Sequence, residues 1–127
     1  MAKLIFNYPF MRREYDLEKF DKNEIYVGRI EKNDITIPDY KLFKKLPVAD
    51  QRFYAKDLIK VSRVHAKFTK QRNKWFIEDV GTKGVGSNYG TFVNEARLEV
   101  FKQYLLQNND KIKFGPINCA FVEGTEE

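Results

Sequence analysis

The sequence lacks most of the side chains that enzyme and metal sites need. Its 127 residues include one cysteine, Cys119, and one histidine, His65. A zinc site typically takes three or four protein ligands, mostly Cys and His, so the common zinc sets cannot be assembled. A lone cysteine also excludes an internal disulfide. We therefore expect no metal site, no cofactor and no enzymatic activity.

The features of secreted and membrane proteins are also missing. No apolar run approaches the roughly 20 residues of a membrane-spanning helix. The N-terminus shows no signal-peptide pattern, and no Asn-x-Ser/Thr glycosylation sequence occurs. The length favours one domain over residues 1–127. We expect a monomer without a membrane partner in the cytoplasm, or in the nucleus if the source is eukaryotic.

Short apolar segments with turn residues between them are what the chain does contain. This pattern is typical of β-strands and predicts an all-β sandwich or barrel. The turn at Gln71-Arg72-Asn73, between alternating segments, predicts a hairpin. The expected strands cover residues 3–8, 24–30, 34–38, 64–69, 74–79, 90–94, 111–115 and 119–124.

Three segments depart from this strand pattern. Residues 40–60 lack strand alternation, and the i, i+4 spacing of Ala49, Phe53 and Asp57 predicts a short helix over 49–58. Residues 98–107 fit a strand or a helix equally well. The acidic tail at residues 126 and 127 is expected to fray.

The charge is basic and unevenly distributed. Lys and Arg exceed Asp and Glu by 23 − 18 = +5. Residues 40–60 contribute six basic side chains against two acidic ones, hence +4 of this excess. A basic excess favours an acidic partner, although a solvated surface explains the same numbers.

Three clusters of polar residues and glycine follow or precede the expected strands: Gly28-Arg29, Ser62-Arg63-Val64-His65, and residues 87–94. The glycine-rich stretch 81–90 is no Walker loop, because Ser87-Asn88 stands where Lys-Ser or Lys-Thr is needed. Ser62 and His65 lack the spacing and the oxyanion hole of a nucleophile–base pair. Strand ends that meet at one rim would instead offer guanidinium, hydroxyl and backbone donors to a phosphate group.

These clusters resemble the motifs of the forkhead-associated (FHA) domain. The resemblance rests on Gly28-Arg29, Asn33-Asp34-Ile35, Ser62-Arg63-Val64-His65-Ala66, residues 90–94 and Asp110-Lys111-Ile112-Lys113-Phe114-Gly115, and it covers about residues 25–122. It implies an FHA-like β-sandwich of about eleven strands that binds phosphothreonine peptides through loops at one end. The segment 40–60 is then a partly helical insertion between two strands beside these loops.

The resemblance also implies a role for each motif residue. Those expected to bind the phosphopeptide are Arg29, Ser62, Arg63, Ser87, Asn88 and Tyr89. Those expected to support the site are Gly28, His65, Gly90, Thr91 and Asn94. The chain departs from the family pattern at Tyr89 and at Asn109, which replace an Asn and a Gly, and in the insertion.

The predicted function is phosphorylation-dependent protein–protein interaction in signalling. One alternative is a module that binds protein without phosphate, and the presence of Arg29, Ser62 and Arg63 argues against it. A second is nucleic-acid binding by the basic insertion, with Phe43, Phe53 and Tyr54 as stacking platforms. We favour the phosphothreonine partner over nucleic acid.

Overall fold

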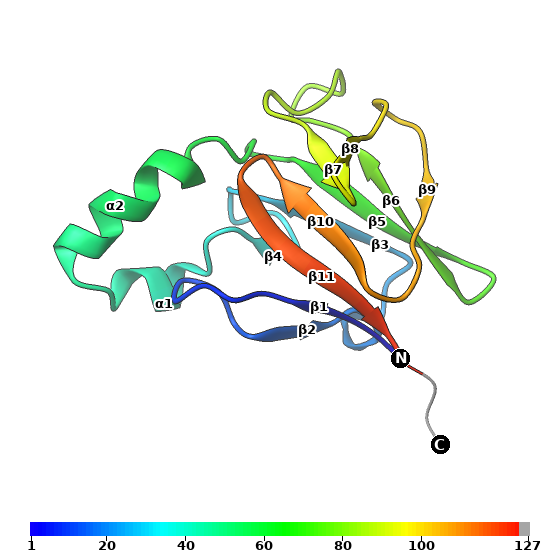
Figure 1. Cartoon of the computed structure of the whole chain (residues 1–127), viewed down its shortest axis with the longest axis horizontal. Helices are drawn as coiled ribbons and strands as arrows, with labels where there is room; N and C mark the ends of the chain where they lie inside the picture. The colour runs from blue at the N-terminus through cyan, green and yellow to red at the C-terminus, as the bar shows by residue number, and fades with distance from the viewer. Residues whose placement is uncertain (125–127) are drawn as a thin grey trace.

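A computed structural model describes residues 1–124; the predicted frayed tail at 126 and 127 lies outside them. Two β-sheets form the body of the protein (Figure 1). One sheet has the order β2-β1-β11-β10-β7-β8 and the other the order β4-β3-β5-β6-β9. The strands are β1 (Ala2–Ile5), β2 (Glu14–Asp16), β3 (Glu24–Gly28), β4 (Ile35–Thr36), β5 (Ala66–Gln71), β6 (Lys74–Asp79), β7 (Thr91–Val93), β8 (Ala96–Arg97), β9 (Tyr104–Leu105), β10 (Asp110–Phe114) and β11 (Ile117–Glu123).

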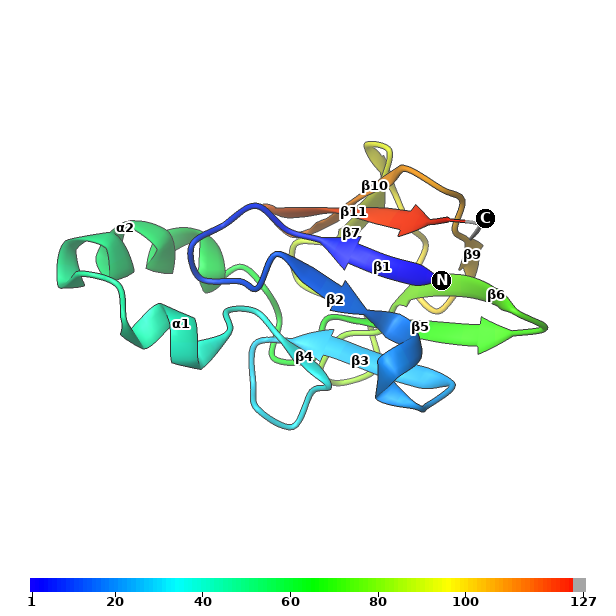
Figure 2. The same ribbon diagram turned by 90° about the horizontal axis from the view of Figure 1, so that it is seen from below.

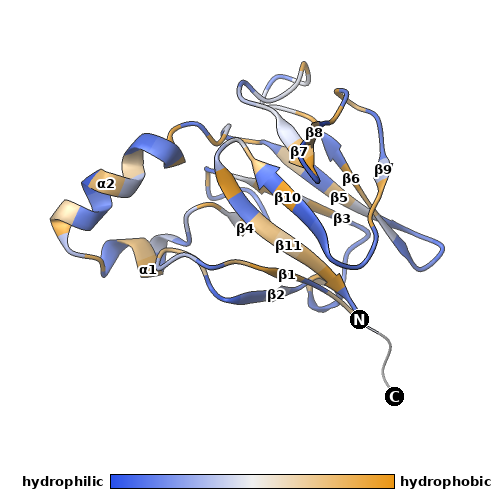
Figure 3. Cartoon of the chain, viewed as in Figure 1, coloured by the Kyte–Doolittle hydropathy of each residue, from blue (hydrophilic) through white to orange (hydrophobic). Residues whose placement is uncertain are grey.

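The two sheets form a sandwich, with the 3₁₀-helix η1 (Leu17–Phe20) beside β2 (Figure 2). Along the strands, apolar and polar residues alternate (Figure 3), so each sheet buries one face against the other. The largest buried side chains are Trp75, Phe6, Phe10, Phe68, Phe114 and Phe121. The predicted β-sandwich of about eleven strands is confirmed.

The predicted hairpin is formed by β5 and β6. Six residue pairs join the two strands, from Ala66 opposite Asp79 to Gln71 opposite Lys74. Arg72 and Asn73 both have positive φ, 53° and 64°, as a two-residue type I′ turn requires. The ambiguous segment 98–107 contains β9 and no helix.

The insertion contains two helices, α1 (Tyr40–Lys44) and α2 (Val48–Leu58), which extend from one end of the sandwich (Figures 1 and 2). The Asp39 side chain caps α1 by accepting hydrogen bonds from the backbone N–H groups of Lys41 and Leu42. Gln51 ties the two helices together, because its Nε2 donates to the Leu46 carbonyl at 2.9 Å. The helix predicted over 49–58 begins one residue earlier, at Val48.

The root of the insertion packs into the core. Leu58 is only 4% exposed, and the Tyr54 ring meets Phe10 edge to face at 5.0 Å. Phe43 also packs against the core, whereas Phe53 is 69% exposed. Of the three aromatic platforms that the nucleic-acid alternative requires, Phe53 is thus the exposed one.

No helix within residues 1–124 is both long and apolar enough to cross a membrane.

Candidate functional site

Three segments meet at the end of the sandwich from which the helices extend: the β3–β4 loop, the segment between α2 and β5, and the β6–β7 loop. The backbone N–H of Arg29 donates to the Ser62 carbonyl at 3.1 Å, and that of Ile30 to the Arg63 carbonyl at 3.3 Å. The Asn88 N–H donates to Ser62 Oγ at 3.1 Å. The three predicted clusters are therefore directly hydrogen-bonded to one another.

A cleft of about 300 Å³ opens between these segments. Five of the six predicted binding residues line it, namely Arg29, Ser62, Arg63, Asn88 and Tyr89. Lysines at its rim raise the number of lining cations to four: Arg29, Arg63, Lys60 and Lys83. No carboxylate is among the lining residues. The cleft is thus suited to an anion.

Arg29 is half-buried, and one hydrogen bond fixes its side chain while another fixes its backbone. Its Nε donates to the Val61 carbonyl at 2.8 Å, while the Tyr40 hydroxyl donates to the Arg29 carbonyl at 2.7 Å. Within residues 1–124 the two Nη groups have no hydrogen-bond partner. The guanidinium is therefore oriented by Nε and keeps its outer donors for a ligand.

Ser62 links the cleft to the β6–β7 loop. Its Oγ accepts the Asn88 N–H, so the hydroxyl proton remains available to donate. The side chains of Asn88 and Arg63 are exposed at the cleft. Tyr89 is 52% exposed, and its ring lies 5.7 Å from Lys60 Nζ.

His65 supports the cleft from below. The side chain is fully buried, its Nδ1 accepts the Ser62 N–H at 3.0 Å, and its Nε2 lies 2.9 Å from the Gly90 carbonyl. Because Nδ1 accepts, Nε2 must carry the proton and donate. Burial lowers the pKa of His65 and keeps the ring neutral. These contacts agree with the supporting role that the resemblance implies.

Gly28 permits close contact between two loops at this point. A Cβ there would collide with the carbonyl oxygen of Arg63 and lie 2.8 Å from Asn33 Nδ2. Asn33 Nδ2 itself donates to that Arg63 carbonyl and to the Ile30 carbonyl, both at 2.7 Å. Any larger residue at 28 would push apart the segments that carry Arg29 and Arg63.

Asp79, at the end of β6, organises the β6–β7 loop. The side chain is 2% exposed and accepts three hydrogen bonds, from Ser87 N–H at 2.6 Å, Ser87 Oγ at 2.6 Å and Thr91 Oγ1 at 2.7 Å. Ser87 Oγ in turn accepts the Gly90 N–H at 3.0 Å. One buried carboxylate therefore fixes both ends of the loop segment that carries Asn88 and Tyr89.

This network corrects the prediction for Ser87. The residue is 8% exposed, is not among those that line the cleft, and uses its hydroxyl within the protein. Ser87 therefore belongs with the supporting residues and not with those that face a ligand.

The remaining predicted supporting residues shape turns. Gly90 has a φ of +89°, where a Cβ would also lie 2.8 Å from Arg97 Nε. Asn94 has a φ of +50°, and its amide bonds Asp110 Oδ1 and the Lys111 N–H, both at 2.9 Å. Both residues place strands that lead away from the cleft.

Sequence reasoning missed several residues of the site. The cleft is also lined by Ile59, Lys60, Thr82, Lys83, Val85 and Gly86. Ile59 and Lys60 belong to the insertion, whose orientation the sequence does not give. Asp79 does not line the cleft; an acidic residue that ends a strand before a glycine-rich loop is expected to cap that loop, and its bonds to Ser87 do so.

Ser62 and His65 do not form a nucleophile–base pair. The His65 ring contacts the backbone N–H of Ser62 and not its hydroxyl, and both ring nitrogens are occupied. Burial raises the pKa of the Cys119 thiol, which keeps it protonated. In the part of the chain that the structure describes, no three His, Cys, Asp or Glu side chains are grouped to hold a metal ion.

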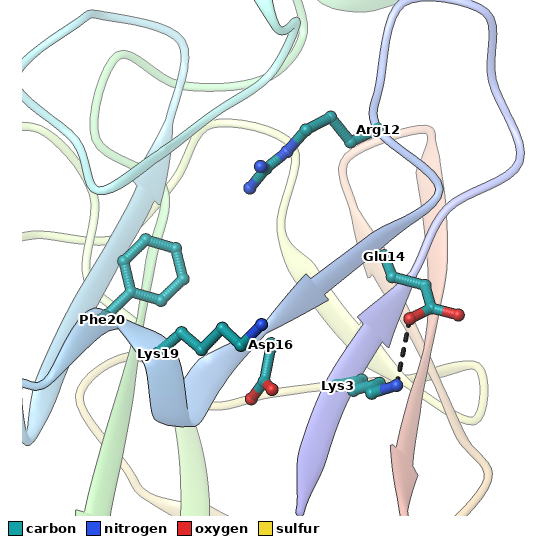
Figure 4. Close-up of a pocket in the computed structure, with 6 residues that line it drawn as sticks. All are labelled: Lys3, Arg12, Glu14, Asp16, Lys19 and Phe20. Atoms are coloured by element: carbon teal, nitrogen blue, oxygen red, sulfur yellow. Dashed lines mark hydrogen bonds and ion pairs between the residues drawn. The ribbon is translucent and has the colours of Figure 1, made fainter.

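A second hollow, of about 350 Å³, lies beside β2 and η1 (Figure 4). It mixes cations with carboxylates, and its Lys3 Nζ already pairs with Glu14 Oε1 at 3.1 Å. The other lining residues are Arg12, Asp16, Lys19 and Phe20. Its charges partly neutralise one another, so it lacks the convergent cations of the cleft between the loops.

Comparison with known families identifies the fold. The model of the FHA domain matches residues 25–115, which is most of the chain. This protein belongs to the FHA domain family. The matched range includes the insertion and every residue of the cleft, from Arg29 to Tyr89.

Individual relatives agree with this assignment. The FHA domain of CT664 protein from Chlamydia trachomatis superimposes with a TM-score of 0.67 at 22% identity, covering 98% of each chain. The N-terminal FHA domain of Rad53p from S. cerevisiae, solved in complex with a phosphothreonine peptide, gives a TM-score of 0.61 at 14% identity, over 97% of this chain and 93% of that one.

A curated relative is similar over a shorter stretch. Probable E3 ubiquitin-protein ligase dma1 of Schizosaccharomyces pombe is 39% identical over 59 residues, which is 43% of this chain. The matched stretch spans about a fifth, 20%, of that ligase.

Proposed function

We propose that this FHA domain is a phosphothreonine-peptide recognition module that mediates phosphorylation-dependent protein–protein interaction. The observation that carries the proposal is the composition of the cleft: four cations, no lining carboxylate, and the unengaged Nη groups of Arg29 beside the Ser62 hydroxyl. A phosphate dianion accepts several charge-assisted hydrogen bonds, and a guanidinium fork matches its geometry. Arg29 and Ser62 bind the phosphate, while Arg63, Asn88 and Tyr89 contact the peptide.

Two comparisons support this function. Rad53p, whose FHA domain has the same fold, was solved with a phosphothreonine peptide, and Mycobacterium tuberculosis EmbR, with a TM-score of 0.63, was solved with a low-affinity phosphopeptide. In this chain Arg29 and Ser62 line one cleft. On that ground we propose that this protein also binds a phosphopeptide.

The domain acts by binding alone, as a monomer without a cofactor. The occupied nitrogens of His65 and the buried thiol of Cys119 support the absence of catalysis. We place the protein inside the cell, because its partners carry phosphothreonine that intracellular kinases produce in signalling.

Titration with phosphopeptides tests the proposal. A degenerate phosphothreonine peptide pool and its unphosphorylated counterpart are measured by fluorescence anisotropy. We expect saturable binding of the phosphorylated pool and at least about tenfold weaker binding of the other, because the lost phosphate leaves several charge-assisted bonds unmade. Equal affinity for the two pools would contradict phosphate recognition.

A further inference from the structure

One face of α2 is exposed along its whole length and mixes apolar with basic side chains. Val48, Arg52, Ala55 and Ile59 recur at helical spacing, so they share this face, and Lys56 borders it. Ile59 caps the helix with φ −64° and ψ −18° and therefore continues the helical geometry. We call these five residues the α2 stripe. Val48 is 62% exposed and Ile59 67% exposed.

The positive charges of the stripe are not neutralised by neighbours. No ion pair within residues 1–124 involves Arg52 or Lys56. The two acids of the helix, Asp50 and Asp57, point roughly opposite to the stripe by helical spacing. A ligand on this face would meet positive charge and apolar surface together.

The stripe runs into the cleft. Ile59 belongs both to the stripe and to the cleft lining, and Lys60 follows it at the rim. The helix cannot swing freely away from this position, because Leu58 is buried and Tyr54 packs against Phe10. A peptide seated in the cleft can therefore continue onto α2 without a break in the surface.

From these contacts we infer that the α2 stripe is a second subsite for the same phosphorylated partner, and that it binds an acidic and apolar segment flanking the phosphothreonine. This inference rests on the proposed phosphopeptide function. Val48 and Ile59 are eleven residues apart, hence about 16 Å along the helix, which an extended segment covers with about five residues. Acidic side chains of the segment pair with Arg52 and Lys56, and apolar ones cover Val48 and Ile59.

A lipid surface is a less suitable occupant. An interfacial helix presents a continuous apolar face with its basic residues on the polar side. Here Arg52 stands between Val48 and Ile59, and the exposed Phe53 lies off the stripe by more than a quarter turn. Membrane binding is therefore one of the outcomes that the experiment below must distinguish.

The test compares two pools of labelled phosphothreonine peptides. The short pool has three degenerate positions on each side of the phosphothreonine; the extended pool adds five positions on each side drawn from Asp, Glu, Leu, Ile and Val. We expect the protein to bind the extended pool about tenfold more tightly, the gain from one well-buried apolar side chain with its charge partners. The double variant Val48→Ser/Arg52→Glu should lose this gain and keep its affinity for the short pool.

A matched variant separates the stripe from general electrostatics. Lys44→Glu/Phe53→Ser also reverses one charge and removes one exposed apolar side chain, but both residues lie off the stripe. It should keep the extended-pool gain. Equal affinities of the unaltered protein for the two pools, or equal losses in both variants, overturn the inference.

Two further outcomes also overturn it. The first is phosphate-independent binding of the short pool, which removes the proposed function as well. The second is binding of phosphatidylserine vesicles that Val48→Ser/Arg52→Glu abolishes, without an extended-pool gain, which assigns the stripe to membranes. When the short pool binds through its phosphate and the extension adds nothing, the inference on α2 fails alone.

Discussion

Buried hydrogen bonds hold the loops of the cleft in place, whereas the outer turns of the neighbouring helix α2 are exposed to solvent. Beneath the cleft, buried polar groups fix the loops: Asp79 is 2% exposed and His65 fully buried, and each bonds two segments. The outer turns of α2 instead lie in solvent, with Val48 and Phe53 more than half exposed. A phosphate needs donors placed in advance, whereas attraction of an acidic peptide needs only charge nearby.

Of the proposed substitutions, loss of the Asp79 carboxylate should lower the stability of the protein most. Asp79→Ala leaves the Ser87 N–H, Ser87 Oγ and Thr91 Oγ1 without their acceptor in a buried site. Each unsatisfied buried group costs roughly 1–3 kcal/mol, so the free energy of unfolding should fall by about 3 kcal/mol or more. Urea denaturation measures it. Asp57→Ala, at an exposed position of α2, should change it by less than about 0.5 kcal/mol.

Arg29→Ala should abolish phosphopeptide binding without unfolding the domain. A charge-assisted hydrogen bond contributes roughly 1.5–3 kcal/mol, so affinity should fall at least about tenfold. Calorimetry measures the affinity, with Arg12→Ala as an exposed arginine control outside the cleft. Ser62→Ala should weaken binding less, because the lost donor is neutral. Unchanged affinity in Arg29→Ala would contradict the assignment of the phosphate site.

The two regions also differ in how far their sequence could be interpreted. The strands of the sandwich core alternate over enough residues to be predicted, but β2, β8 and β9 have only two or three residues and show no such alternation. The helix α2 follows from spacing, whereas its direction does not. Leu58 and Tyr54 set that direction by packing on a core distant in sequence.

Within the site, the motifs located the cleft but not the orientation of each side chain. Five of the six residues expected to bind the phosphopeptide line it, namely Arg29, Ser62, Arg63, Asn88 and Tyr89. Ser87 does not, because a hydroxyl in a loop can face a ligand or a buried carboxylate, and its position in sequence is the same in both cases. The acceptor that decides the matter, Asp79, is eight residues away.

Acidic pH should lower the stability of the folded protein through His65. Burial lowers the pKa of His65 in the folded state, so below about pH 6.5 the unfolded chain binds a proton that the folded chain does not. Stability is therefore complete above that pH and falls as the pH decreases toward the lowered folded value, by up to about 1.4 kcal/mol per pH unit.

Urea denaturation at pH 7 and pH 5.5 measures this effect. His65 is the one histidine of the chain, so few other groups titrate in this window. His65→Gln should lose most of the pH dependence while being less stable at pH 7. A pH dependence that persists unchanged in His65→Gln would show that another group is responsible.

Neutralising the lysines of α1 and its C-cap tests whether exposed charge on the insertion attracts the ligand. Lys41, Lys44 and Lys45 are exposed, and Lys→Gln at all three lowers the net charge from +5 to +2. We expect the association rate for acidic phosphopeptides to fall several-fold at low salt and the difference to shrink as salt is added. Stopped-flow fluorescence measures the rate. A salt-independent difference would mean that the lysines make direct contacts instead of steering the ligand.

A preference for phosphothreonine over phosphoserine is the smallest expected effect. It should depend on the cleft and not on the inserted helices. The two ligands differ by one methyl group, and one buried carbon contributes roughly 0.8 kcal/mol, or about fourfold in affinity. The stiffer χ1 of threonine adds to this. Calorimetry with matched peptides should give the same ratio in the triple Lys→Gln variant, because a methyl contact is short-ranged and independent of charge on α1. Equal affinities for the two peptides would mean that the cleft buries no methyl group and reads the phosphate alone.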